Sequence, residues 1–331
     1  MHRREFISLI GVAVAWNSQS AAYSQTRGKL PLVGVLIPGS ADQLNDRLAG
    51  LRRGLREAGL VEDRNYALVT RFADGDLSRI PALTQELGEL KPVVIVVAAV
   101  VNFVHGMLPQ MPLVFTSYAA DPIASGLAQS YARPGGLVTG NVLNAIGGEE
   151  ALAAKRMSLF GELVPHVTRI GMLGPLEGLL LEKEKAALKK VGAQLGFEVS
   201  NYSLKSIDDL EEAIARGLRD EVSAFYLSGE PMLTINKSRA VPALSKAGRP
   251  TVGPYPELAR AGILMSYSSD LDDGFRHAGS YVAKILGGTK PSDLPIEQAS
   301  KFVFAINLKT AKALNIAVPP SLLALADEVI E

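Results

Sequence analysis

The chain of 331 residues contains no cysteine. This absence excludes disulfide bonds, thiolate catalysis and cysteine-ligated metal sites. The four histidines (His2, His105, His166 and His277) do not have the spacing of a metal site. The sequence also lacks a Walker loop, a G-x-S-x-G turn and a G-x-G-x-x-G stretch after a strand. It therefore predicts no catalytic residue, no metal and no cofactor, and the protein is not expected to be an enzyme.

An excess of charge of one sign is also lacking, because 34 basic residues balance 34 acidic ones. A neutral chain has no general attraction to nucleic acid or to an anionic membrane surface. No apolar run reaches the roughly 20 residues that a membrane-spanning helix needs. What is present is a hydrophobic content of 47%, typical of a globular protein, and enough length for two domains. We expect no nucleic-acid partner and no direct membrane insertion.

The N-terminus has the layout of a secretory signal peptide. Arg3 and Arg4 precede an almost uncharged apolar stretch over residues 8–16, and small residues at 21, 22 and 24 allow cleavage near Ser24. The arginine pair favours the twin-arginine route, and an ordinary Sec signal is the alternative. The sequence therefore predicts a signal peptide over residues 1–24 and a mature protein in the periplasm.

Short apolar runs alternate with helix-periodic segments along most of the chain. This alternation predicts βαβ units and parallel sheets, and thus an α/β fold. The expected strands of the first half span 32–37, 66–72, 93–98 and 113–116, and those of the second half span 168–173, 197–202, 223–227 and 250–253. Two halves of similar length indicate two Rossmann-like parallel-sheet lobes with a cleft between them.

Three further segments carry specific predictions. Asp121 and Pro122 are expected to open a helix that residues 132–136 close, and one helix is expected over about 234–247. A short strand over 263–265 is followed by a cluster of hydroxyls over 266–269. Asp270 then caps a helix that ends at Gly287.

Polar residues cluster where the predicted strands end. In parallel sheets these ends lie at one edge, and two facing edges form a cleft. Hydroxyls, amides and tyrosines there suit a small solute with one anionic group and a flat or apolar body, although small polar residues are common in such turns. The predicted ligand-binding residues are Ser40, Asn102, Ser117, Tyr118, Asp121, Asn141, Ser228, Glu230, Tyr255, Ser266 and Tyr267.

Several segments resemble one bacterial family, the substrate-binding proteins of ABC transporters, whose better-known relatives handle tryptophan and tyrosine. The matching segments are 121–122, 133–140, 264–267, 284–295, 301–314 and 326–331. The resemblance implies a type I periplasmic binding-protein fold. It also implies an N-terminal lobe of residues 29–140 plus 268–303 and a C-terminal lobe of 141–267 plus 304–331. As partners it implies a small-molecule solute and an ABC transporter permease, with the cleft closing by a hinge.

The loops depart from this family more than the framework does. The stretches 38–42 and 98–102 are, respectively, less acidic and more apolar than usual, and the only tryptophan, Trp16, lies in the predicted signal peptide. The predicted solute is therefore a small organic molecule that is amino-acid-like or an aromatic or carboxylate compound. Two alternatives stay open: an exported α/β enzyme that uses Ser117 and Asp121, and a ligand-sensing module for a membrane receptor.

Overall fold

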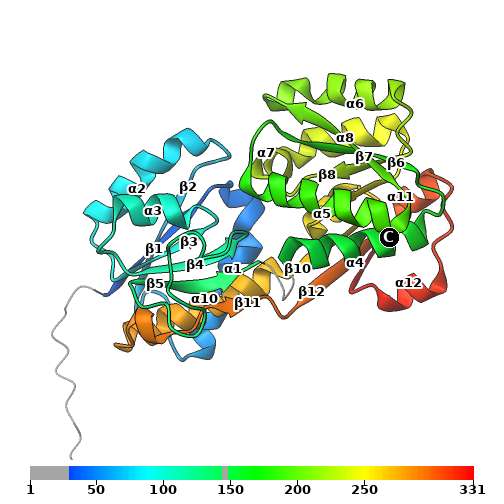
Figure 1. Cartoon of the computed structure of the whole chain (residues 1–331). Coiled ribbons are helices and arrows are strands. Elements are labelled where there is room, and N and C mark those ends of the chain that lie inside the picture. Colours follow the sequence, from blue (N-terminus) through cyan, green and yellow to red (C-terminus); the bar gives the residue numbers. More distant parts are fainter. Residues whose placement is uncertain (1–29, 144–147) are drawn as a thin grey trace, which may run out of the picture.

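The computed structural model describes residues 30–143 and 148–331, which form two α/β lobes (Figure 1). The predicted signal peptide, residues 1–24, lies outside the described residues. Among the described helices, none is both long and apolar enough to cross a membrane.

The first sheet has the strand order β11-β5-β4-β3-β1-β2, and all neighbouring strands are parallel. The central strand β3 is a buried β-branched run, as expected for a strand covered on both faces. Its lobe comprises β1 (Leu32–Ile37), α1 (Ala41–Glu57), β2 (Ala67–Phe72), α2 (Ile80–Glu89), β3 (Val94–Ala98), α3 (Val101–Met107), β4 (Leu113–Tyr118), β5 (Val138–Val142), α10 (Leu271–Leu286) and β11 (Glu297–Gln298).

Helices α1 and α10 cover one face of this sheet and pack closely against each other. Leu51 and Leu55 of α1 meet Phe275 of α10 in one buried cluster. The close approach depends on glycine, because a Cβ added at Gly54 would lie 1.9 Å from the carbonyl oxygen of Arg276. This contact fixes α10, which enters the lobe from the opposite end of the chain.

The second sheet has the order β13-β12-β10-β9-β8-β6-β7 and is parallel except for the antiparallel pair β10–β12. Two buried clusters cover its two faces. Its elements are α4 (Gly148–Leu163), β6 (Arg169–Pro175), α5 (Leu179–Leu195), β7 (Glu198–Leu204), α6 (Leu210–Arg219), β8 (Ala224–Leu227), α7 (Pro231–Ile235), α8 (Lys237–Ala247), β9 (Thr251–Gly253), α9 (Pro256–Ala261), β10 (Met265–Ser269), β12 (Phe302–Asn307), α11 (Leu308–Ala313), α12 (Pro320–Leu325) and β13 (Glu328–Ile330).

The predicted α/β fold with two mostly parallel sheets is confirmed. The chain passes between the sheets after β5, at Asp270 between β10 and α10, and at residues 299–301 between β11 and β12. Figure 1 shows α10 and β11, in orange, within the N-terminal lobe. The exact extent of each lobe as a moving unit stays a prediction.

The helix predicted from Asp121 is wrong. Residues 122–126 form turns, in which Asp121 Oδ1 accepts a hydrogen bond from the Ile123 N–H at 2.9 Å. The Ser125 hydroxyl also donates to the carbonyl oxygen of Asp121 at 2.7 Å, and Gly126 has a φ of +72°. Local side-chain hydrogen bonds and a left-handed glycine replace the helical pattern here.

Two other boundaries differ from the prediction. The helix expected over 234–247 is split into α7 and α8 at Asn236, whose side chain donates to the Met232 carbonyl at 2.8 Å. The strand expected over 263–265 is instead β10, which contains the hydroxyl cluster. Pairing with β12 extends β10 to Ser269, because Ser269 lies opposite Phe302.

Candidate functional site

A cleft of about 270 Å³ lies between the two lobes. It opens at the carboxyl ends of strands β1 and β3, where the strand order of the first sheet reverses, and it faces the end of β8 in the second sheet. Such switch points are where open α/β sheets bind ligands. The apolar part of its wall includes Ile37, Leu77, Ala98, Val100, Leu143, Leu180, Ile235 and Leu271.

An ion pair between the lobes borders this cleft. Arg47 Nη2 of α1 lies 2.6 Å from Glu257 Oε1 of α9, and both side chains line the cleft. A second link runs from Lys183 Nζ of α5 to the carbonyl oxygen of Ala119, at 2.6 Å, near the end of β4. The described conformation therefore holds the lobes together at two points.

Glu230 is a second acidic residue of the described cleft wall, and its carboxylate accepts a hydrogen bond from the backbone. Its Oε1 accepts a hydrogen bond of 2.7 Å from the Leu181 N–H in the first turn of α5. Burial raises the pKa of Glu230, against the opposing effect of hydrogen bonds from the Leu181 and Leu180 backbone. The ionised carboxylate is thus less favoured here than in water.

Ser117 lies where the two sheets face each other and has an unusual backbone. Its φ is +54°, which is rare for a residue other than glycine, and it falls in the irregular part of β4 between Phe115 and Tyr118. Its Oγ is buried and has no hydrogen-bond partner among the described residues. A strained residue with an unpaired hydroxyl in a cleft is a feature typical of a binding site.

Tyr255 and Lys237 complete the polar wall from the C-terminal lobe. Tyr255 is 9% exposed and follows β9, and burial raises the pKa of its phenol well above the usual range. Lys237 begins α8 and is partly buried. Within residues 30–143 and 148–331, neither side chain has a hydrogen bond or ion pair with another group. Together with Ser117, they supply the polar side-chain groups that the described part of the cleft wall leaves available to a ligand.

Four of the predicted ligand-binding residues thus line the cleft, namely Ser117, Tyr118, Glu230 and Tyr255. Tyr118 contributes its ring only, because its hydroxyl bonds to Asn102 Oδ1 and, at 2.8 Å, to Ser125 Oγ. Asn102 and Asp121 are exposed and lie outside the cleft wall.

The other predicted residues lie in the second sheet or beside the cleft. Ser40 precedes α1, and its side chain makes no capping hydrogen bond. The Ser228 hydroxyl donates to Glu184, and Ser266 is fully buried in β10. Tyr267 stacks on Phe302, with ring centroids 6.0 Å apart. A ligand-binding role for these residues stays a prediction.

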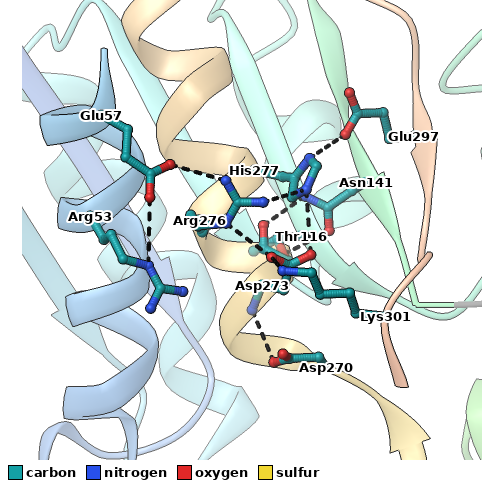
Figure 2. A network of polar contacts seen from close by, with 11 residues as sticks. Arg53, Glu57, Thr116, Asn141, Asp270, Asp273, Arg276, His277, Glu297 and Lys301 are labelled. Carbon is teal, nitrogen blue, oxygen red and sulfur yellow. Dashed lines mark hydrogen bonds and ion pairs between the residues drawn. The ribbon is translucent and has the colours of Figure 1, made fainter. Parts of the chain in front are cut away.

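Asn141 belongs to a polar network around the first turn of α10 (Figure 2). Its Oδ1 accepts from Thr116 Oγ1 at 3.0 Å, and its Nδ2 donates to the Gly274 carbonyl at 2.8 Å. Asp273 receives Lys301 Nζ at 2.9 Å, and its own N–H donates to Asp270 at 3.0 Å. The three passages between the lobes are therefore tied to one helix end.

The electrostatics of this helix end favour the ionised form of the Asp273 carboxyl group. Burial acts to raise the pKa of Asp273, but the hydrogen bonds from Lys301 and Arg276 outweigh it and lower that pKa. His277 adds a contact of 2.5 Å from Nδ1 to Glu297 (Figure 2). A second cavity, of about 260 Å³, borders the same side chains and shares Ser117 with the cleft.

Sequence reasoning missed a buried charged cluster beneath the cleft. Arg156 is 1% exposed and lies 3.1 Å from Glu149, and its guanidinium also contacts the Tyr226 hydroxyl. Glu184 is fully buried and accepts hydrogen bonds from the Ser228 hydroxyl and from the Gly229 N–H at 3.1 Å. These bonds hold the loop that carries Glu230. No motif could indicate them, because the partners are far apart in the chain.

Among the described residues, no base forms a hydrogen bond with the Ser117 hydroxyl in the cleft. The enzyme alternative requires Ser117 and Asp121 to meet, but Asp121 is outside the cleft wall and its Oδ1 caps a turn. In the described part of the chain, no group of three acidic or histidine side chains is placed to hold a metal ion.

Comparison with known proteins agrees with this geometry. Residues 32–330 match the family described as ABC transporter substrate binding protein. The tyrosine-binding protein of Clostridioides difficile strain R20291 is 19% identical over 272 residues, which cover 80% of this chain and 75% of that protein.

Solved structures share the fold at low sequence identity. An ABC domain from Streptococcus pneumonia in complex with L-Trp has a TM-score of 0.81 at 23% identity, over 91% of this chain and 100% of that chain. A 5-methylthioribose transporter solute binding protein from Thermotoga lettingae has a TM-score of 0.59 at 14% identity, over 89% and 98% of the two chains.

Proposed function

The chain belongs to the family of ABC transporter substrate-binding proteins, and on that premise we propose that it is the periplasmic receptor of an ABC importer. It would capture one small organic solute in the interlobe cleft and deliver it to a permease in the inner membrane. Closure of the lobes around the solute would be the step that the permease recognises.

The observation that carries this proposal is the composition of the cleft wall. Ser117 comes from the N-terminal lobe, whereas Tyr255 and Lys237 come from the C-terminal lobe. A ligand that contacts groups of both lobes stabilises the closed form relative to the open one, since only the closed form offers all the contacts. The chain passages between the sheets provide the hinge for such a motion.

The proposed solute is amino-acid-like or an aromatic carboxylate. Its apolar body would contact the aliphatic wall, and its polar end would meet the hydroxyls and Lys237. The cleft volume of about 270 Å³ lies just below the range of roughly 300–1,000 Å³ typical of ligand pockets, which favours a small molecule. The tyrosine-binding relative and the L-Trp complex support this class of solute.

Mass spectrometry of the solute released on denaturation tests the function. The protein purified from its native periplasm should release one small organic molecule per chain, and that molecule should be recovered unchanged after incubation with the refolded protein. Stoichiometric conversion of the molecule would instead support the enzyme alternative. We propose that no turnover occurs, because no base among the described residues forms a hydrogen bond with the Ser117 hydroxyl.

The proposed location depends on the N-terminal segment. N-terminal sequencing of the periplasmic protein should find cleavage near Ser24, and a retained Met1 would contradict it. Replacing Arg3 and Arg4 by lysine should block export by the twin-arginine route but leave Sec export intact.

A further inference from the structure

The charged groups of the cleft wall are unequally available to a ligand. The part of the wall that the structure describes carries two basic residues, Arg47 and Lys237, and two acidic ones, Glu230 and Glu257. Arg47 and Glu257 neutralise each other at 2.6 Å. Glu230 accepts the Leu181 N–H at 2.7 Å. Among the described side chains this leaves the ammonium of Lys237 as the charge without a counter-ion.

Like the Lys237 ammonium, the uncharged polar groups of the wall suit an anionic ligand. The Ser117 and Tyr255 hydroxyls have no hydrogen-bond partner in residues 30–143 and 148–331, and both can donate to an acceptor. Two hydroxyl donors and one ammonium suit a carboxylate, whose two oxygens only accept. The rest of the wall is largely aliphatic and suits an apolar body.

An ammonium group on the ligand would find no equivalent partner among the described residues of the wall. Glu257 would have to leave Arg47, which would open the contact between the lobes. Glu230 is a poor counter-ion, since burial raises its pKa and its Oε1 already receives a backbone N–H. A cation enclosed without a counter-ion is strongly unfavourable.

We propose that the cleft selects apolar monocarboxylates that lack an ammonium group, with Lys237 as the counter-ion and the Ser117 and Tyr255 hydroxyls as donors. This inference rests on the proposed receptor function and narrows its solute class. It separates this chain from the tyrosine-binding relative and from the similar structure solved with L-Trp, since both of those ligands are amino acids.

Matched pairs of probes that differ only in the amine test this selectivity. Isothermal titration of the wild-type protein would compare 3-phenylpropionate with L-phenylalanine, and hexanoate with L-norleucine. The acid of at least one pair should bind more than about ten-fold more tightly than its amino acid, the factor that an unpaired polar group of about 1.4 kcal/mol produces. An amino acid that binds as tightly as its matched acid would overturn the proposal.

Substitution of Lys237 tests whether this residue is the counter-ion of the bound acid. Lys237→Met should weaken binding of the preferred acid by about ten- to one hundred-fold, and Lys237→Arg should recover part of it. Lys246→Met is the matched control, because Lys246 is an exposed residue at the other end of α8. Retained acid affinity in Lys237→Met would overturn the assignment of the counter-ion.

If no probe binds, the identity of the solute released from the native protein tests the selectivity for acids over amino acids. An acid without an amine supports the selectivity, whereas an amino acid contradicts it but leaves the receptor function intact. If no probe binds and no solute is released, both the selectivity and the proposed receptor function are contradicted.

Discussion

Arg47 of α1 and Glu257 of α9 form an ion pair that joins the two lobes beside the cleft. Their Nη2 and Oε1 atoms are 2.6 Å apart, and the side chains are only 20% and 23% exposed. Because the two residues are far apart in sequence and belong to different lobes, the pair can form only when the lobes approach each other. The contact is therefore a reporter of closure.

Loss of this ion pair should weaken ligand binding indirectly, because it removes a contact that stabilises the closed form. The double substitution Arg47→Gln/Glu257→Gln removes an attraction that stabilises the closed form by about 0.4–1 kcal/mol and leaves neither charge unpaired in the cleft wall, so the dissociation constant should rise about two- to five-fold. Titration calorimetry measures this change. The double substitution Glu212→Gln/Arg219→Gln is the control, since this pair is exposed and confined to α6. Equal affinities for the two variants would contradict a role for the pair in closure.

Two substitutions can separate the contribution of the Ser117 hydroxyl to binding from the contribution of the Ser117 backbone conformation to stability. Ser117→Ala and Ser117→Gly both remove the hydroxyl, so each should weaken binding by about 1 kcal/mol, and by up to roughly 3 if the partner is a carboxylate. Glycine tolerates the φ of +54° better than alanine, so the glycine variant should melt at the higher temperature in the ligand-free state. Wild-type affinity in both variants would exclude Ser117 from the site.

Tyr255 should contribute more to binding than Ser117. Tyr255→Ala removes a large ring from the cleft wall and should cost more affinity than Ser117→Ala, whereas Tyr255→Phe should cost only the hydroxyl's share of about 1 kcal/mol. Calorimetry of both variants with the same solute provides the comparison. If the alanine variant binds like the wild type, the ring does not contact the solute.

The buried carboxyl of Glu184 should make stability depend on pH. Burial, together with the nearby Glu149, raises its pKa from 4.5 to about 7, against the opposing effect of Arg156. Between these two values the folded chain holds a proton that the unfolded chain releases, so this group's contribution to stability is highest at low pH and falls as pH rises to about 7.

Urea unfolding of the wild type and of Glu184→Gln between pH 4 and 8 isolates this contribution. The stability of the wild type relative to the variant should fall from about pH 4.5 to pH 7 and stay level above it, because glutamine does not titrate. A relative stability that is flat or rises with pH would show that Glu184 is ionised throughout this range.

Local patterns were sufficient for the layers of the fold. The buried run of β3 and the helix capped by Asp270 follow from the spacing of apolar residues and from a capping side chain, and both are present. The helix expected after Asp121 is absent, because hydrogen bonds made by Asp121 and Ser125 compete with it. Such competition is not visible in periodicity.

The site was predictable only in part, because its charges are paired over long sequence separations. Strand ends correctly placed Ser117 and Tyr255 in the cleft wall. Ser228 follows a strand in the same way, but its hydroxyl bonds to Glu184 of α5. The sequence also did not reveal that Lys237 lines the cleft, since this depends on the break between α7 and α8. Tertiary packing decides these positions.

Small-angle scattering of the mature protein with and without its released solute tests the central claim of solute capture by closure most directly. Ligand contacts from both lobes should favour the closed form, so the radius of gyration should be smaller with the solute than without it. An unchanged radius, together with wild-type affinity in Ser117→Ala and Tyr255→Ala, would contradict both the closure and the position of the site.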